Sequence, residues 1–386
     1  MNSEGKGKKM MIVGLFALVL GLMLLTTNLM GGKETQANGS GTPSGTPRAN
    51  TPRTFSEKAS GELLNIFRVS PQSEQPSQTE QVKEVTAELV SQLIKSGANV
   101  NTSDEIGRTP LMWATGRGLT FEVIKLLVDS GADVNATTTD DSKRTPLILA
   151  TLRPQNFEVV KLLVDSGANV NATTTLRGSE FTPLKGAIAH SEPCLDTVKY
   201  LVENGADVNV SMNGLNNFGA PISGFTPLIY AVYRSQPCLE VVQYLIGSGA
   251  DVNAAMVVTG GFGPIVKGTP LILAINAKAP IDIVKVLIDA GADVNATASM
   301  TTPLIAAIEH PNLDVMRLLI ENGADVNAAA GGMSPLQLVY ARRRGSDPQK
   351  NALAEEKYRI LLDAGADDSS IRQMEDTFRR HFGGGI

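Results

Sequence analysis

Side chains able to carry out chemistry are sparse in this 386-residue chain, which has two cysteines and three histidines. They cannot form a disulfide framework, and they leave little material for a His/Cys metal site. The sequence contains no metalloprotease HExxH, hydrolase GxSxG, phosphate-binding P-loop or Cys-x-x-Cys motif. Gly260-Gly261-Phe262-Gly263 is rich in glycine but does not lie between a strand and a helix. The sequence therefore predicts no enzyme activity, no cofactor and no metal.

Basic residues recur at one position of a repeated tripeptide, Thr/Ser-Pro-Leu. Seven residues after its proline, six of the seven copies have Arg or His. One interpretation is that each cation serves the C-terminus of its own helix, where a positive charge is favourable by about 0.3–1 kcal/mol. The other is that the cations capture an acidic segment of a partner protein, with arginines binding carboxylates in pairs of hydrogen bonds and histidines adding charge below about pH 6.5. We call this set the basic row; it consists of Arg117, Arg153, His190, Arg234, His310 and Arg342.

The elements that position these residues repeat with a period of about 33 residues. The string Gly-Ala-[Asp/Asn]-Val-Asn occurs seven times and alternates with Thr/Ser-Pro-Leu. The Thr or Ser supplies an N-cap oxygen, and proline fits the first position of a helix. A second apolar-periodic helix ends at the glycine of the other string, which favours a left-handed conformation. Neither helix can bury its apolar face alone, so the units must stack into an array.

The two strings resemble those of the ankyrin repeat over residues 82–367. The resemblance implies an all-α repeat solenoid of stacked helix–loop–helix units, with β-hairpin fingers projecting between units. The family often has histidine after Thr-Pro-Leu, where this chain has other residues such as Met112 and Ile148; we expect the fold to be unaffected. The resemblance also implies a protein-binding scaffold, with the basic row facing the concave groove beside the fingers, and we expect a monomer.

Both ends of the array have a predicted cover. Residues 82–101 carry only the second-helix half of a unit and are interpreted as the N-terminal cap, followed by repeats over 102–367. Residues 368–382 are predicted to form a C-terminal capping helix, with a capping box at Ser370-Ile371-Arg372-Gln373. The apolar stripe of this helix is expected to close the last repeat; it consists of Ile371, Met374, Phe378 and Phe382.

Two adjacent fingers are much longer than the others. The distance from the repeat's Asn to the next Thr is 17 residues at Asn209 and 16 at Asn253, against 7 at Asn295. Solvent-exposed loops are usually polar, but these two are apolar. They are interpreted either as anchors for a partner or as a private core, that is, a small apolar core formed where the two fingers pack on each other. The partner-contact residues predicted here are Met212, Leu215, Phe218, Ile222, Phe225, Met256, Phe262 and Ile265.

The segment before the array indicates the compartment. Three lysines precede an apolar stretch over 10–30 that is long enough to cross the roughly 30 Å hydrocarbon core of a bilayer. Residues 1–30 are therefore predicted to be a signal-anchor or a cleaved signal peptide, with the repeats outside the cytoplasm, periplasmic or extracellular. Residues 31–81, rich in Gly, Ser, Thr, Pro and Gln, are predicted to be a disordered tether. Within it, the apolar stretch 62–67 is either a short docking helix or a transient helix with no role, and we favour the latter.

Charge and composition narrow the function further. Lys+Arg number 34 against Asp+Glu 39, a formal net charge of −5. Such a chain has no general affinity for polyanions, which argues against nucleic-acid binding. The leading hypothesis is a membrane-anchored, extracytoplasmic scaffold that binds another protein through its fingers and groove. The alternatives are a secreted effector or inhibitor of a soluble protein, and a structural spacer in the envelope without a specific ligand.

Overall fold

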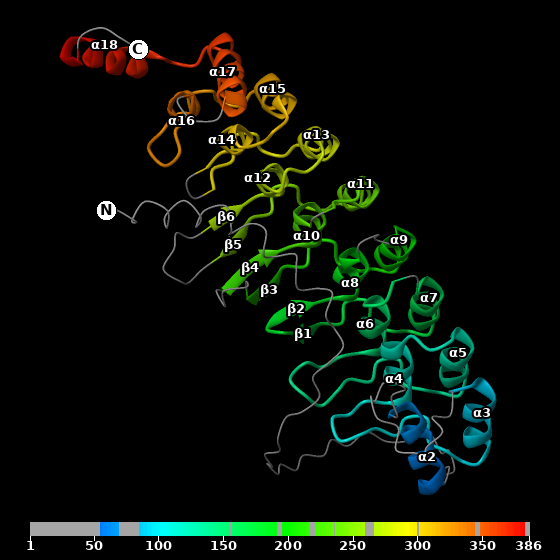
Figure 1. The fold of residues 1–386 in the computed structure, drawn as a ribbon. Helices are drawn as coiled ribbons and strands as arrows, with labels where there is room; N and C mark the ends of the chain where they lie inside the picture. Colours follow the sequence, from blue (N-terminus) through cyan, green and yellow to red (C-terminus); the bar gives the residue numbers. More distant parts are fainter. Residues whose placement is uncertain are drawn as a thin grey trace, which may run out of the picture.

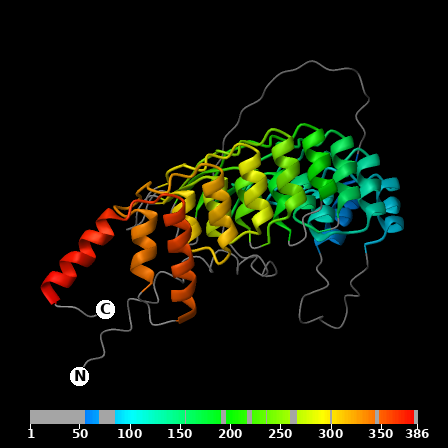
Figure 2. The ribbon, with the colours of Figure 1, turned by 90° about the horizontal axis from the view of Figure 1, so that it is seen from above.

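The computed structural model describes residues 55–68, 85–154, 156–190, 195–215, 221–234, 236–258, 266–298, 301–343 and 348–382. Across these ranges, pairs of antiparallel helices stack in one direction into an elongated array, with the fingers along one side (Figures 1 and 2). No helix in these ranges is long and apolar enough to cross a bilayer. The predicted signal-anchor, residues 1–30, lies outside them.

Each unit contributes a first and a second helix. The first helices are α2 (Glu57–Arg68), α4 (Pro110–Arg117), α6 (Pro146–Thr151), α8 (Pro183–Ala189), α10 (Pro227–Tyr233), α12 (Pro270–Asn276), α14 (Pro303–Ile308) and α16 (Pro335–Arg342). The second helices are α3 (Ala87–Lys95), α5 (Phe121–Asp129), α7 (Phe157–Asp165), α9 (Leu195–Glu203), α11 (Leu239–Gly247), α13 (Ile281–Asp289), α15 (Leu313–Glu321) and α17 (Pro348–Asp363). A last helix, α18 (Ser369–Phe382), follows.

The helix boundaries lie where the two strings place them. At the start of α4, the Thr109 hydroxyl accepts a hydrogen bond from the Met112 N–H, and Pro110 occupies the first helical position. Ser334 starts α16 in the same way and adds a full capping box with Gln337. Past the end of α5, Gly131 has a φ of +89°, in the left-handed region that glycine adopts at low cost. Local sequence therefore sets the length of most helices.

The asparagine of the second string joins each unit to the next. The side-chain amide of Asn135 donates to the Gly167 carbonyl at 2.8 Å, and its oxygen accepts from the Asn169 N–H at 2.8 Å. This two-way contact repeats down the array and fixes the stacking of successive turns. The asparagines that make both bonds are Asn101, Asn135, Asn171, Asn209, Asn253 and Asn295.

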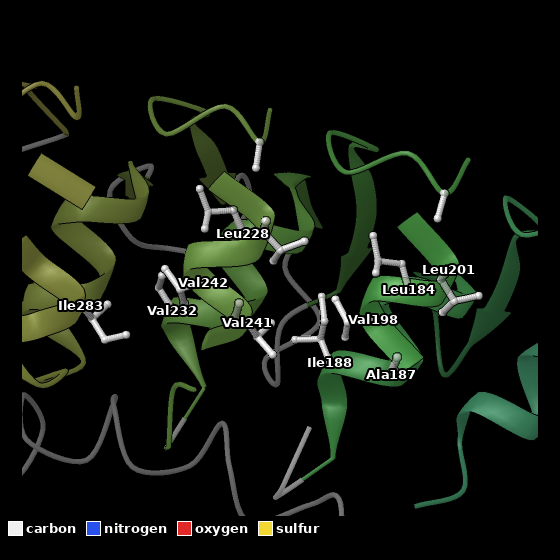
Figure 3. Close-up of a cluster of buried hydrophobic side chains, with 14 of the residues drawn as sticks. Leu184, Ala187, Ile188, Val198, Leu201, Leu228, Val232, Val241, Val242 and Ile283 are labelled. Carbon is white, nitrogen blue, oxygen red and sulfur yellow. The ribbon is translucent and has the colours of Figure 1, made fainter. Parts of the chain in front are cut away.

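One continuous apolar core runs through the stack, from Ala59 in α2 to Ile371 in α18. Figure 3 shows its middle, where Ile188 of α8 lies beside Val198 of α9, and Leu228 of α10 belongs to the next unit. Each inner unit thus buries its apolar faces against both neighbours, as expected for a solenoid.

The N-terminal end differs from the prediction. Residues 57–68, assigned to a disordered tether, form α2, and Leu63 and Phe67 are fully buried against α3 and α4. The cap over 82–101 is therefore not a half unit, because α2 is its first helix. The prediction failed because 18 residues separate α2 from α3, and α2 begins without a Thr-Pro-Leu string.

The C-terminal helix forms at the predicted residues but covers the last repeat only in part. Ile371 is buried, whereas Met374 is 55% exposed, and α18 projects away from the array (Figures 1 and 2). Ser370, assigned to the capping box, accepts a hydrogen bond at its hydroxyl from the Gln337 amide of α16 at 2.8 Å. The side chains of Phe378 and Phe382 lie outside the described residues.

Candidate partner-binding surfaces

The two long fingers combine into one four-stranded antiparallel sheet, here called the long-finger sheet. Its strands are β3 (Met212–Leu215), β4 (Pro221–Phe225), β5 (Met256–Val258) and β6 (Val266–Gly268), paired in that order. The hairpin before it, β1 (Thr174–Leu176) with β2 (Ser179–Phe181), forms a separate two-stranded sheet. Ile222 pairs with Val258 and Ser223 with Val257, so the sheet crosses from one repeat to the next. The extra residues of these fingers therefore build an ordered platform over α10 and α12.

A small apolar core lies under the long-finger sheet. Met256 is 5% exposed and is buried with Ile229 of α10 and Leu273 of α12, while Ile222 and Phe225 pack against them. Met212, on β3, is 1% exposed. These contacts support the second interpretation of the fingers, a private core, for the side chains that are described. Met212 and Met256 are therefore wrong as partner-contact residues, because a partner cannot reach them in this arrangement.

Four predicted contact residues are not tested by these contacts. Phe218, Phe262 and Ile265 lie outside the described residues, as does the side chain of Leu215. They remain predictions. Two described residues of the sheet, Asn213 and Ser223, are exposed to solvent and are polar without charge.

Lys185 is a residue that sequence reasoning missed. It occupies the position after Thr-Pro-Leu at the start of α8 and is only 7% exposed, although it is a lysine. Its ammonium donates to the Glu180 carbonyl at 2.9 Å and lies 5.1 to 5.5 Å from the ring centroids of Phe181, Phe225 and Tyr230. Burial lowers the pKa of Lys185 to about 8, against the opposing attraction of Glu180. One cation thus joins the β2 finger to the base of the long-finger sheet.

The basic row makes contacts that neither interpretation anticipated, because its members reach back to the preceding repeat. Arg117 donates to the Phe67 carbonyl at the end of α2 at 2.7 Å, and Arg153 donates through Nε to the Gly116 carbonyl of α4 at 2.9 Å. Arg234 donates to the Ile188 carbonyl of α8 at 2.7 Å. Each of these three arginines therefore caps the first helix of the preceding unit, at the C-terminal end where backbone carbonyls lack helical partners.

The two histidines of the row differ. The Nε2 atom of His190 lies 2.8 Å from the Thr151 carbonyl, at the end of α6. His310 is 4% exposed and accepts the Asn312 N–H at Nδ1, so its ring is neutral, and burial lowers its pKa. The expectation that His310 would add charge for a partner is wrong. Arg342 forms an ion pair with Glu309.

At the end of α14, Lys357 of α17 takes the place that arginines of the basic row have at the ends of α2, α4 and α8. It is 3% exposed, and its ammonium donates to the carbonyls of Ile308 and His310 at 2.6 and 2.8 Å. Aligning the units on the proline of Thr/Ser-Pro-Leu could not identify Lys357, because it lies in a second helix.

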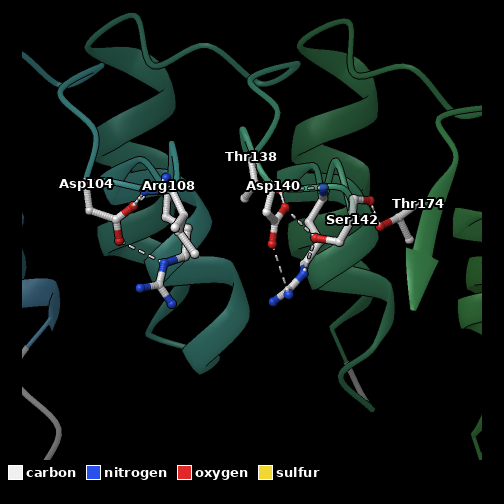
Figure 4. A network of polar contacts seen from close by, with 8 residues as sticks. Asp104, Arg108, Thr138, Asp140, Ser142 and Thr174 are labelled. Atoms are coloured by element: carbon white, nitrogen blue, oxygen red, sulfur yellow. Dashed lines mark hydrogen bonds and ion pairs between the residues drawn. The ribbon is translucent and has the colours of Figure 1, made fainter. Parts of the chain in front are cut away.

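The first fingers are held by polar networks rather than by an apolar core (Figure 4). Asp104 accepts from Arg108 at 2.8 Å, and Arg108 lies 4.0 Å from the Trp113 ring centroid. In the next finger, Asp140 accepts from Thr138 and Ser142 at 2.5 and 2.6 Å. Burial alone would raise the pKa of Asp140, but these hydroxyls and the nearby guanidinium of Arg144 outweigh it and lower the pKa.

Within the described ranges, no group of three or more His, Cys, Asp or Glu side chains is placed to hold a metal ion. The Cys238 thiol lies 3.1 Å from the Glu240 carboxylate, and burial raises the pKa of Cys238. Cys194 lies outside the described residues.

Comparison with known proteins agrees with this architecture. The family described as ankyrin repeats (3 copies) matches residues 82–174 and 261–339, and that described as ankyrin repeats (many copies) matches 187–246. The ankyrin repeat protein FPV233 of Fowlpox virus (strain NVSL) is 40% identical over 55 residues, which are 14% of this chain and 11% of that protein. The chain therefore spans about a tenth of the length of this curated relative.

Among solved structures, the human ASB11 ankyrin repeat domain is 25% identical, with a TM-score of 0.47. The match covers 65% of this chain and 98% of that one. The family matches together cover more than half of the chain, and they fall on the stacked helices from α3 to α16, whereas α2, α17 and α18 lie outside them. The chain belongs to the ankyrin repeat family.

Proposed function

We propose that this chain is a protein-binding scaffold whose main contact surface is the long-finger sheet, displayed outside the cytoplasm on an N-terminal membrane anchor. Ankyrin repeats imply a protein-interaction scaffold. The observation that supports this particular surface is the sheet itself. The neighbouring finger closes with a single bridge between Ala298 and Thr301, whereas the long fingers form four paired strands.

The composition of the long fingers supports a contact that does not depend on charge. Residues 210–225 and 254–266 contain no Asp, Glu, Lys or Arg, although 19% of the whole chain is charged, and Lys267 of β6 is the one charged residue in the four strands of the sheet. Ser223 and Asn213 face solvent on this sheet, and Val257, the pairing partner of Ser223, is half-buried. We therefore expect an uncharged contact on the partner and an affinity that changes little with salt.

An acidic partner segment in the groove is the weaker candidate. It requires guanidinium donors of the basic row beyond those already given to the preceding repeat. In the structure, Arg117, Arg153 and Arg234 already donate to carbonyls of the preceding repeat. Binding through the row would carry a strong salt dependence, which separates the two candidates.

The test is a crosslinked pull-down from native membranes with three forms of the full chain. Ser223→Arg places a bulky charge on the exposed face of the sheet, away from the small core beneath it. Ser166→Arg is the matched control, because Ser166 is exposed at the end of α7. A protein captured by the wild type and the control, but lost with Ser223→Arg, supports the sheet as the contact surface. Equal capture by all three forms contradicts it.

The location is tested by determining the N-terminus of the mature protein in fractionated cells. Residues 1–30 retained in the membrane fraction support the anchor, and their removal in a soluble external fraction supports a secreted effector. A structural spacer predicts no saturable partner in either fraction.

A further inference from the structure

Hydrogen bonds join successive fingers into one ribbon along the array. In the first joints, a backbone N–H of each finger donates to the finger before it. These bonds run from Thr139 to the Ile106 carbonyl at 2.9 Å, from Thr175 to the Ser142 carbonyl at 3.1 Å, and from Asn213 to the Glu180 carboxylate at 2.6 Å. The pairing of β4 with β5 extends the ribbon across the next joint. Each finger up to this joint thus serves as a pairing surface for the finger that follows.

The ribbon ends at β6, the strand of the long-finger sheet nearest the C-terminal units (Figure 1). The next finger has only 7 residues from Asn295 to Thr302, and it closes with the bridge between Ala298 and Thr301. Among the described residues, no backbone hydrogen bond joins β6 to this finger, and β5 is the one strand paired with β6. The outer edge of β6 therefore presents backbone N–H and C=O groups without a strand partner.

An open strand edge selects its ligand by hydrogen bonding. An extended segment of another chain can satisfy the N–H and C=O groups of this edge in the way that β5 satisfies those of β4. A helix cannot, because its own backbone groups are already bonded to one another. The joint between the two long fingers already uses this mode of contact, so an added strand would continue an existing interface.

The charge at this edge argues against a second copy of the chain as the ligand. Lys267 is the middle residue of β6, in register with Val257, which is in register with Ser223 of β4. Two antiparallel copies of β6 that pair over their whole length would place Lys267 opposite Lys267, and like charges directly opposite each other are destabilising. A lysine in an edge strand is also a common device against self-pairing. The edge therefore favours a different chain, with an acidic or uncharged residue opposite Lys267.

We propose that the outer edge of β6 takes an extended segment of the partner protein, which adds a fifth strand to the four of the long-finger sheet. This inference rests on the proposed function and names how the partner contributes to it. The added strand pairs through its backbone and carries Asp, Glu or an uncharged residue, but not Lys or Arg, opposite Lys267. The partner then contacts both this edge and the solvent-exposed face that bears Ser223.

The probe is a labelled peptide of residues 253–259 of this chain, which contains the β5 sequence, with Val257→Glu. Bound to the outer edge of β6 in the register of β5, it places a carboxylate opposite Lys267. The full chain should bind this peptide and show slower amide hydrogen exchange in residues 266–268, measured by mass spectrometry. The Val257→Lys peptide should bind about five times more weakly. A peptide N-methylated at residues 256–258 should not bind, because it lacks the N–H groups that strand pairing needs.

A charge reversal in the chain is the matched control. The full chain with Lys267→Glu should reverse the preference and bind the Val257→Lys peptide more tightly than the Val257→Glu peptide. Equal binding of the two peptides by the unaltered chain, binding of the N-methylated peptide, or unchanged exchange in residues 266–268 would overturn the proposal. A concentration-dependent dimer that the Val257→Glu peptide dissociates would assign the edge to a second copy, and would overturn it as well.

A competition experiment links the edge to the partner. The Val257→Glu peptide in excess should release the protein that the unaltered chain captures from native membranes, and the N-methylated peptide should not. Capture that is lost with Ser223→Arg but resists the peptide would retain the face of the sheet as the contact surface and overturn only the edge. Capture that survives Ser223→Arg but is released by the peptide would support the edge and contradict the face.

Discussion

At the scale of single residues, Lys185 is a buried cation at the base of the long-finger sheet. It carries a positive charge into a site lined by Phe181, Phe225 and Tyr230, with one carbonyl as its hydrogen-bond acceptor. Aromatic faces attract a cation, but burial penalises it, and the lowered pKa shows that burial prevails. The base of the long-finger sheet is therefore sensitive to alkaline pH.

Replacing this lysine should remove a pH dependence of stability. The pKa of Lys185 is about 8 in the folded chain and 10.5 in the unfolded chain, so above pH 8 the unfolded chain binds more protons and stability rises with pH. Relative to Lys185→Met, the free energy of unfolding of the wild type should increase by about 2 kcal/mol between pH 7 and 9.5. Urea denaturation of both proteins measures this difference. Parallel pH profiles would show that Lys185 does not titrate in this range.

At the scale of elements, two helical glycines show how closely first helices approach. A Cβ on Gly186 of α8 would lie 2.4 Å from the Thr151 hydroxyl of α6, whereas one on Gly116 of α4 would meet Leu149 at 3.7 Å. Gly116→Ala should raise the free energy of unfolding by about 0.5–1 kcal/mol, because alanine favours a helix and the space is available. Gly186→Ala should lower it by about 1–3 kcal/mol, because α6 and α8 must move apart. Thermal unfolding of the two variants measures both changes. Equal shifts in melting temperature would contradict the close approach of α6 and α8.

The basic row couples neighbouring helices. Arg153 lies after α6, but its guanidinium donates to the Gly116 carbonyl at the end of α4. Arg153→Ala should lower the free energy of unfolding by about 1 kcal/mol and speed amide hydrogen exchange around the end of α4. Hydrogen exchange followed by mass spectrometry locates the effect. Faster exchange confined to α6 would instead mean that Arg153 serves its own helix.

At the scale of the whole molecule, stability is a sum of contacts between neighbouring units, so the ends depend on their covers. Deleting residues 1–81 removes α2 and uncovers the faces of α3 and α4 that bury Val90 and Leu111. This deletion should lower the melting temperature and make α3 the least protected helix in hydrogen exchange. Deleting only 1–54 should leave the melting temperature unchanged. The same melting temperature for both truncated chains would contradict the assignment of α2 to the first unit.

The sequence alone determined the repeated unit, because each of its signals acts within a few residues. Thr109 and Pro110 start a helix and Gly131 follows the end of another through local hydrogen bonds and backbone preferences. The family, the order of elements and the two long fingers followed from counting those signals. The registration of successive units by Asn135 and its equivalents was not predicted, although the asparagine itself was visible in the string.

Other contacts have no sequence signal nearby, and only the tertiary structure decided them. α2 lacks the Thr-Pro-Leu string and packs on helices more than twenty residues away, so nothing near it in sequence marked it as core. The partner of Arg117 is the carbonyl of Phe67, fifty residues earlier, and Met256 of the long fingers packs under a sheet that needs two repeats to form. Lys185 became buried only because β2 and β4 bring their aromatic rings to it. Periodicity fixes which residues share a face, but the contacts between units depend on how the units stack, and stacking is settled by packing across the whole array.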